Sequence, residues 1–309
     1  MASRLPNAGD YGLLLLLSAI WGSSFVFIKV GVDEVPPVTL TAIRLFLAAA
    51  FLLLVMVVTK RQFPKGKAIW WMMVASAVTG NALPFCLIAW GQQTIPPGTT
   101  AILMGIMPLI TLVLAHIFTD DEKLNSRKVT GMIIGVLGLC VLVGQAALFG
   151  LTADLVAMLA LLAAAASYGF NAVLIRRMKA PDKTAAVAMI ILLSAIMVMP
   201  FAFMLEDPLA VEAGMLAWSA VVTLGVLHAA IATLIMFAII GRAGASFFSQ
   251  LNLLVPIAGV MWAALLFSEI PGPNALAALG LIILGILIAK GGLALGSPVP
   301  AVEKEVAKS

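Results

Sequence analysis

The chain has 309 residues, of which 63% are hydrophobic and only 10% are charged, with a formal net charge of +4. A soluble domain carries roughly 25% charged residues, so this composition excludes a soluble enzyme, a soluble nucleic-acid-binding protein and a disordered chain. The two cysteines, Cys86 and Cys140, lie in apolar runs and indicate neither a disulfide framework nor a metal cluster.

Ten apolar runs follow one another along the chain, each close to the roughly 20 residues that a bilayer-crossing helix needs. They cover residues 11–31, 37–59, 69–93, 97–119, 128–149, 153–178, 184–205, 213–240, 244–268 and 273–293. The runs are continuous rather than alternating, which predicts helices and not barrel strands. The first run continues to Val30 without an Ala-x-Ala site, so we expect a retained span and not a cleaved signal peptide.

The positive charges sort to one side of these ten spans. With the N-terminus inside, the inner segments receive 16 of the 18 Lys and Arg residues, namely Arg4, Lys60, Arg61, Lys65, Lys67, Lys123, Arg127, Lys128, Arg176, Arg177, Lys179, Lys183, Arg242, Lys290, Lys304 and Lys308. Only Lys29 and Arg44 fall elsewhere. Cytoplasmic loops carry an excess of Lys and Arg, so both termini are predicted to be cytoplasmic.

The two halves of the chain resemble each other. Matching residues recur at a separation of 147 or 148, in the pairs Trp21 and Tyr168, Gly22 and Gly169, Lys29 and Arg176, Asn81 and His228, Pro108 and Pro256, and Asp121 and Glu269. This predicts two five-helix repeats, residues 1–149 and residues 150–309, the second ending in a short charged tail. Because five is odd, the second repeat must enter the membrane inverted, as in secondary transporters.

The order of these motifs resembles the EamA family, the ten-helix branch of the drug/metabolite transporter superfamily. The motifs are the segment 19–25 (AIWGSSF), Arg44 in the second span, Pro108 followed by Asp120-Asp121-Glu122, and Pro256 followed by Ser268-Glu269. The resemblance covers residues 10–293. It implies a permease of the bacterial inner membrane, most similar to exporters of aromatic and other neutral amino acids.

Polar and aromatic residues near the span centres predict where a substrate binds, because transporter sites lie near the bilayer midplane between the repeats. The predicted substrate-binding residues are Trp21, Ser24, Asn81, Met107, Tyr168, Asn171, His228, Gln250 and Asn252. They place spans one, three, four, six, eight and nine around a central cavity, with spans two, five, seven and ten as outer scaffold. Pro108 and Pro256 each remove a backbone hydrogen bond and are predicted to be matched hinges, with helix shape as the alternative role.

Two ionisable residues carry open alternatives. His228 is predicted to contact the substrate or a gate, to couple transport to protons, or to bond a neighbouring helix without a direct role. Arg44 either attracts a substrate carboxylate or extends to the interface as an anchor. Gly131 and Gly135 permit close helix approach, for which packing within the chain is favoured over dimerisation.

Missing motifs and missing carboxylates limit the chemistry and the substrates that the sequence predicts. The sequence lacks a Gly-x-x-x-x-Gly-Lys-Ser/Thr loop, a His-Glu-x-x-His motif and a Gly-x-Ser-x-Gly motif, so ATP hydrolysis within the chain and hydrolase chemistry are not expected. No carboxylate lies near a span centre, which favours neutral or zwitterionic substrates over permanent cations. We expect no cofactor and no bound metal.

The sequence therefore predicts a monomeric permease whose partners are a small metabolite and the lipid bilayer, without nucleic acid. Transport of drugs, sugars or nucleotide-linked metabolites is the first alternative. A membrane-embedded enzyme acting on lipid-linked substrates is the second, and it would use His116 with Asp120-Asp121-Glu122. Transport direction and proton coupling stay open.

Overall fold

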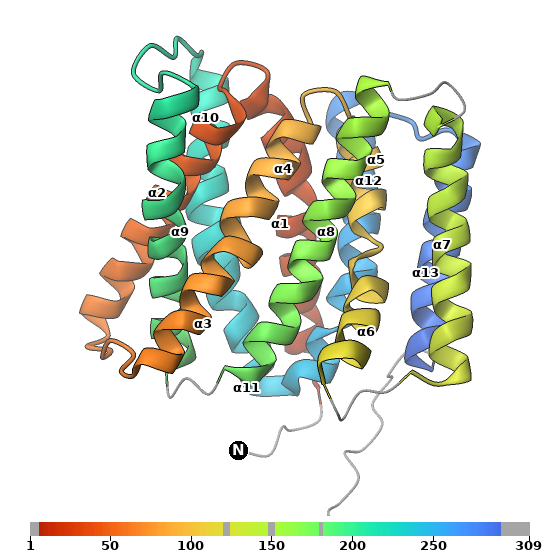
Figure 1. The fold of residues 1–309 in the computed structure, drawn as a ribbon, viewed down its shortest axis with the longest axis horizontal. Coiled ribbons are helices and arrows are strands. Elements are labelled where there is room, and N and C mark those ends of the chain that lie inside the picture. The colour runs from red at the N-terminus through yellow and green to blue at the C-terminus, as the bar shows by residue number, and fades with distance from the viewer. Residues whose placement is uncertain (1–5, 120–123, 148–151, 179–181, 292–309) are drawn as a thin grey trace, which may run out of the picture.

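A computed structural model describes residues 6–119, 124–147, 152–178 and 182–291 (Figure 1). Within these ranges all the regular structure is helical. The helices are α1 (Ala8–Val32), α2 (Pro37–Val58), α3 (Lys67–Ala77), η1 (Val78–Ala82), α4 (Leu83–Gly91), α5 (Pro97–Met104), α6 (Met107–Phe118), α7 (Ser126–Ala147), α8 (Ala153–Arg177), α9 (Lys183–Leu205), α10 (Met215–Thr223), η2 (Leu224–Ile231), α11 (Ala232–Phe248), α12 (Leu251–Phe267) and α13 (Pro273–Lys290).

These elements combine into ten helical spans, some of which consist of two or three consecutive helices. In the described residues, nine are long and apolar enough to cross a bilayer, including the composite spans Lys67–Gly91, Pro97–Phe118 and Met215–Phe248. The tenth is α12, a shorter apolar helix of 17 residues. The predicted all-α, ten-helix architecture is confirmed, and the helix ends lie within a few residues of the apolar runs for eight of the ten spans. The eighth span continues to Phe248, eight residues beyond its predicted end.

The ninth span differs from its prediction. Its predicted run begins at Gly244, which has a left-handed φ of 88° inside α11 and so interrupts the helix. The chain then turns at Ser249 and Gln250 before α12 begins at Leu251. Glycine accepts this backbone conformation without the steric cost that a Cβ adds. The apolar run is therefore divided by a bend that hydropathy does not detect.

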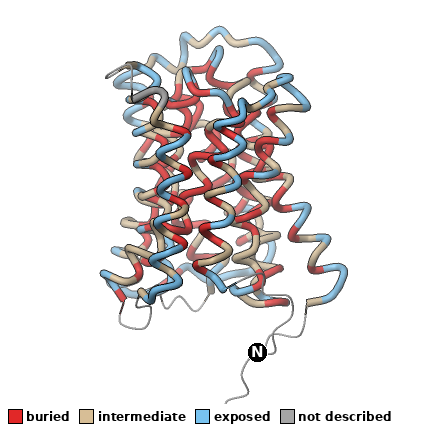
Figure 2. Tube along the Cα trace, turned by 90° about the vertical axis from the view of Figure 1, so that its right-hand side faces the viewer, coloured by how far each residue is buried: buried red, intermediate tan, exposed pale blue. Residues whose placement is uncertain are grey.

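The outside of the bundle is apolar. Large hydrophobic side chains on different helices are strongly exposed, among them Phe46 at 56%, Trp71 at 73% and Leu265 at 70%. Figure 2 shows the buried positions running through the interior of the bundle while exposed positions face outward. In water such a surface would favour aggregation, whereas in lipid it is the expected exterior, because helices already satisfy their own backbone groups.

Glycines bring particular helices into close contact. A Cβ added at Gly22 would lie 2.6 Å from the Ala258 Cβ, so the absence of a side chain lets α1 approach α12. Gly169, the residue that matches Gly22 in the second half, faces Thr111 of α6. Gly131 packs against Gly285 of α13, so this small-residue motif is used within the chain.

The two ends of the bundle in Figure 1 differ in the charged residues of their connecting segments. The lower end carries the start of α1, the end of α13 and the connections that follow α2, α6, α8 and α11. We call it the basic end because of its Lys and Arg residues, namely Arg61, Lys65, Arg127, Arg176, Arg177, Lys183, Arg242 and Lys290. The upper end is called the acidic end and holds Asp33, Glu34, Asp154, Glu206, Asp207, Glu212 and Glu269. The predicted sorting of charge is therefore present in the fold.

Helix contacts are mirrored between the halves. Helix α1 packs on α12 and α10, while α8, which matches α1, packs on α5, α6 and α4. The pairs α2 with α9 and α7 with α13 each join one helix to its counterpart, and α5 of the fourth span packs on α12 of the matching ninth span. This pattern agrees with the predicted inverted repeat, which stays a prediction.

Candidate functional site

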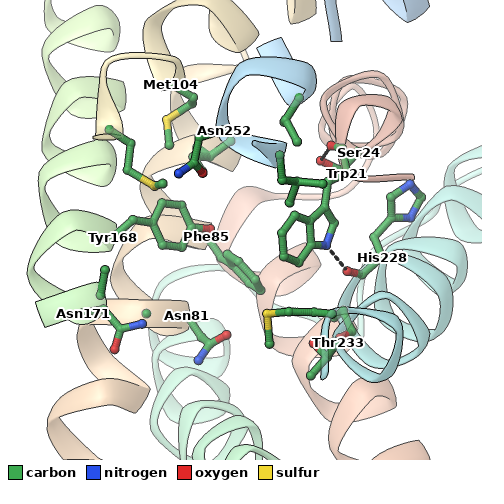
Figure 3. A pocket seen from close by; sticks show the side chains of 18 of the residues that line it. Trp21, Ser24, Asn81, Phe85, Met104, Tyr168, Asn171, His228, Thr233 and Asn252 are labelled. Carbon is green, nitrogen blue, oxygen red and sulfur yellow. Dashed lines mark hydrogen bonds between the residues drawn. The ribbon is translucent and has the colours of Figure 1, made fainter. Parts of the chain in front are cut away.

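A cavity of about 400 Å³ lies in the middle of the bundle and is lined from both halves (Figure 3). Six of the lining spans are those predicted to surround it. The prediction that spans two and seven are outer scaffold was wrong, because Arg44 of α2 and Val187, Ile190 and Ile191 of α9 also line the cavity. Among the described residues, α7 and α13 contribute none of the lining and pack on each other at one side of the bundle.

Most of the predicted site residues meet in this cavity. The lining includes Trp21, Ser24, Asn81, Met107, Tyr168, Asn171, His228 and Asn252, together with both predicted hinge residues, Pro108 and Pro256. Gln250 is not in the lining and lies in the turn between α11 and α12. Its apparent mid-span position came from the assumption that the ninth span is one helix from residue 244.

His228 is held by the protein on every polar side. Its Nε2 lies 3.0 Å from Ser23 Oγ, and its Nδ1 lies 3.1 Å from the Thr223 carbonyl oxygen. Its own carbonyl accepts a hydrogen bond of 3.1 Å from Trp21 Nε1. A carbonyl only accepts, so Nδ1 carries the proton that faces Thr223. The ring lies beyond the Trp21 indole, away from Tyr168 and Asn171 (Figure 3).

These contacts give His228 a role in positioning Trp21. The π-helical segment η2 places the Thr223 carbonyl opposite the imidazole of His228, five residues later. The imidazole is only 3% exposed, and direct substrate contact would require the ring to leave partners that it already has. The alternatives of proton coupling and interhelical bonding both remain compatible with this geometry.

The amide side chains divide into two groups. Asn171 Oδ1 accepts a hydrogen bond of 2.6 Å from Ser76 Oγ, and the same amide packs on Gly80 of η1. By contrast, Asn81 and Asn252 line the cavity without a side-chain hydrogen bond in the described part of the chain. Their amides are therefore available to a ligand, each with both donor and acceptor atoms.

Aromatic rings form two walls of the cavity. Phe85 and Tyr168 meet edge to face with centroids 6.4 Å apart, and Trp21 and Phe248 meet edge to face at 6.2 Å. The predicted placement of Trp21 and Tyr168 in the cavity therefore holds. Phe85 was not predicted, because an aromatic residue in an apolar run carries no sequence signal that distinguishes a cavity from the core.

Arg44 is buried and faces the cavity. Only 5% of the residue is exposed, and its Cζ lies 3.8 Å from the centroid of the Phe85 ring. Its Nε is buried and has no hydrogen-bond partner among the described residues. The alternative that Arg44 extends to the interface as an anchor was wrong, since an anchor would place the guanidinium in water.

The two prolines occupy different positions in their helices. Pro108 is the second residue of α6, directly after the chain is interrupted at Gly105 and Ile106. Pro256 lies inside α12. Both line the cavity, so both helices are altered where a substrate would pass; hinge motion stays a prediction.

Of the residues of the alternative enzyme site, the structure describes only His116. Asp120, Asp121 and Glu122 lie outside the described residues. His116 Nδ1 accepts a hydrogen bond of 3.4 Å from the Leu124 N–H. The described residues contain no group of three or more His, Cys, Asp or Glu side chains that could hold a metal ion.

An apolar helical bundle with a central cavity lined by amides and aromatic rings has the architecture of a polytopic membrane transporter. The EamA-like transporter family matches residues 10–144 and, a second time, residues 155–290. The chain therefore belongs to the EamA-like transporter family and is a membrane transporter.

Curated relatives and a solved structure agree with this assignment. The chain is 26% identical over 265 residues to the uncharacterized transporter YoaV of Bacillus subtilis, covering 83% of this chain and 88% of the relative. It is 27% identical over 288 residues to a probable amino-acid metabolite efflux pump of Salmonella typhimurium, covering 90% and 94%. A crystal structure with 21% identity superposes with a TM-score of 0.66 over 92% of this chain and 99% of the other.

Proposed function

We propose that this transporter exports small neutral or zwitterionic metabolites, including aromatic amino acids, across the bacterial inner membrane. The observation that carries the proposal is the central cavity, whose volume of about 400 Å³ falls in the range of small-molecule sites. Trp21, Phe85 and Tyr168 offer aromatic surface to an apolar side chain, and Asn81 and Asn252 offer free amides to polar groups. The probable amino-acid metabolite efflux pump of Salmonella supports the same substrate class.

The lining charges fit a zwitterion better than a permanent cation. No Asp or Glu side chain is among the described residues that line the cavity. A cation in a cavity of low dielectric would need an acidic partner, which is why ionisable groups inside membrane proteins are usually paired. A neutral molecule, or one whose charges sum to zero, does not carry this cost.

We propose alternating access between two inverted repeats as the mechanism. The double match to one transporter family and the mirrored helix contacts support the repeat. Lining residues near the acidic end are buried, with Ile28 at 3%, Ile88 at 4% and Ala101 at 0%, whereas Ile175 near the basic end is 43% exposed. This supports a cavity closed at the acidic end and accessible from the basic end. Because cytoplasmic loops carry an excess of Lys and Arg, we expect the basic end to face the cytoplasm, and we expect the protein to act as a monomer.

Flux into proteoliposomes tests this function. We expect the purified protein to move labelled phenylalanine and leucine, and we expect Trp21→Ala to reduce that flux by about tenfold, the loss that corresponds to about 1.4 kcal/mol. Trp71→Ala is the matched control, because Trp71 is 73% exposed on the apolar perimeter. Flux equal to that of empty liposomes for every amino acid would refute the substrate class.

His228→Ala is the second variant in the same assay. The His228 ring bonds Ser23, two residues after Trp21 in α1, whereas the carbonyl that accepts from the Trp21 indole is backbone and is kept in the variant. We expect loss of the ring to displace this part of α1 and to reduce flux for aromatic substrates in the same direction as Trp21→Ala. Unchanged flux in His228→Ala, with normal expression, would remove His228 from the mechanism.

A further inference from the structure

We propose that Arg44 is the carboxylate receptor of this transporter, so that a carboxylate is the group that the cavity requires of its substrates. This inference rests on the proposed function and makes it more specific. It distinguishes amino acids and other carboxylates from amines, amides and uncharged drugs of the same size.

The first observation is the burial of a cation without a counterion. Arg44 is 5% exposed, lines the cavity and makes no ion pair within the described residues. Its buried Nε has no hydrogen-bond partner there either. A buried charge is expected to be paired, because the loss of hydration is large and an unpaired ion recovers none of it. An anionic ligand is the partner that this arrangement lacks.

Glu206, directly after α9, already accepts hydrogen bonds elsewhere. It reaches the start of α2, where its Oε1 accepts from the Val38 N–H at 3.1 Å and its Oε2 from the Thr39 N–H at 2.7 Å. None of the described residues that line the cavity is Asp or Glu, and Glu206 is not among them. Within the described part of the chain, Arg44 therefore faces the cavity without a counterion.

The orientation of the guanidinium fits a ligand in its plane. Cζ lies over the Phe85 ring, 3.8 Å from its centroid, so the ring covers one side of the guanidinium, and Phe85 itself lies edge to face against Tyr168. Stacking occupies a face of a guanidinium and leaves its N–H groups, which point outward in the plane, free to bond. Two parallel N–H groups match the two oxygens of a carboxylate.

The surrounding residues suggest how the rest of the substrate lies. Aromatic surface from Phe85 and Tyr168 adjoins the guanidinium, and Trp21 forms another part of the same cavity. A molecule with its carboxylate on Arg44 would therefore have its apolar part against these rings. Because no carboxylate lines the cavity, an amino group is tolerated rather than required.

Competition on the unmodified protein gives the first test. Uptake of labelled phenylalanine is measured against unlabelled phenylalanine, phenylalaninamide, phenethylamine and 3-phenylpropionate. We expect phenylalanine and 3-phenylpropionate to compete well, and the two compounds without a carboxylate to compete at least tenfold more weakly. Equal competition by all four would overturn the role of Arg44 and leave the proposed function intact. Absence of flux for every labelled compound would overturn both.

Variants of Arg44 give the second test. We expect Arg44→Gln to lose the preference for phenylalanine over phenylalaninamide, bringing their ratio close to one, and Arg44→Lys to keep part of it. Arg242→Gln is the matched control, because Arg242 is exposed at the basic end. If Arg44→Gln lowers both fluxes equally and keeps their ratio, Arg44 is only structural and the proposal is wrong. If Arg44→Gln does not fold, Arg44→Lys and the competition series decide.

Discussion

The acidic and basic ends of the bundle are held together differently. At the acidic end, three glutamates cross between the halves and accept hydrogen bonds from N–H groups at helix starts, namely Glu34 from Gly214, Glu206 from Val38 and Thr39, and Glu269 from Gly98. At the basic end, the described residues provide one carboxylate contact between the halves, the pair of Arg61 with Asp182 at 2.9 Å. A carboxylate at a helix start also meets the positive end of the helix dipole.

The difference is informative because the two ends use matching positions. Asp182 follows Glu34 by 148 residues, and Gly214 follows Gly66 by the same number. Glu34 bonds the Gly214 N–H at the start of α10, whereas Asp182 bonds Arg61 in the segment before α3. If the halves exchange conformations, the acidic end is expected to loosen toward the present arrangement of the basic end.

The largest expected effect comes from removing Glu206. Glu206→Ala leaves two helix-start N–H groups of α2 without their charged acceptor, and hydrogen bonds to charged groups contribute about 1.5–3 kcal/mol each. A loss of about 2 kcal/mol shifts the ratio of conformations by roughly 30-fold toward opening at the acidic end. The measurement is labelling of Ser24→Cys, in a chain with Cys86→Ser and Cys140→Ser, by an impermeant thiol reagent applied at the acidic end.

Asp207→Ala is the matched control for this variant, because Asp207 is an exposed neighbour in sequence. Labelling rates of Ser24→Cys that are the same with Glu206→Ala and Asp207→Ala would mean that the acidic end is not closed by this contact.

A smaller effect is expected from Gly98→Ala. A Cβ at position 98 would lie 2.8 Å from Glu269 Oε1, so the carboxylate must move away from the Gly98 N–H. Losing this one hydrogen bond to a carboxylate would cost about 1.5 kcal/mol and raise labelling from the acidic end about tenfold. Gly280→Ala, where nothing lies within 4 Å of the added Cβ, serves as the control. If both variants label alike, Glu269 does not hold this end.

The smallest effect is expected at the basic end from Arg61→Gln. The side chains of Arg61 and Asp182 are 39% and 30% exposed, and surface pairs contribute about 0.2–1 kcal/mol. We expect less than a fivefold change in transport, decreasing further at high salt. If the fold-change in transport for Arg61→Gln exceeds the fold-change in labelling for Glu206→Ala, the basic end and not the acidic end has the stronger contact.

The same pair predicts little pH dependence near neutrality. Partial burial opposes ionisation of Asp182, but hydrogen bonds from the Ala185 N–H and the Arg61 guanidinium outweigh it and lower the pKa below its ordinary value of 3.8. A lowered carboxyl pKa contributes stability above that ordinary value and loses it only as the pH falls through the folded-state pKa. Arg61→Gln should therefore have the same small effect across roughly pH 5 to 8.

Much of the fold could be predicted because membrane helices leave a strong local pattern. The span from Pro37 to Val58 was predicted to within one residue, since its apolar run begins at prolines and ends at Lys60 and Arg61. The ninth span could not be predicted as well, because the left-handed backbone of Gly244 leaves hydropathy unchanged.

The candidate site was predicted in part. Trp21 and Asn81 line the cavity, as their central positions in the spans indicated. Gln250 does not line it, because the bend after Gly244 makes α12 begin at Leu251, which leaves Gln250 outside the helix. The sequence could not distinguish a carboxylate-binding Arg44 from an interfacial anchor, because sequence position does not reveal how a helix is rotated about its axis. Its contact with Phe85 depends on that rotation in two helices at once.

The ten spans, the separation of basic and acidic ends, and most of the residues at the cavity can be predicted before the helices are packed. These features follow from hydropathy and charge, which act residue by residue in a bilayer. The long-range pairings, such as His228 with Ser23 across 205 positions and Glu206 with Thr39 across 167, are defined only once the helices are packed. Such pairings depend on helix rotation, depth and crossing, and a local period does not encode these quantities.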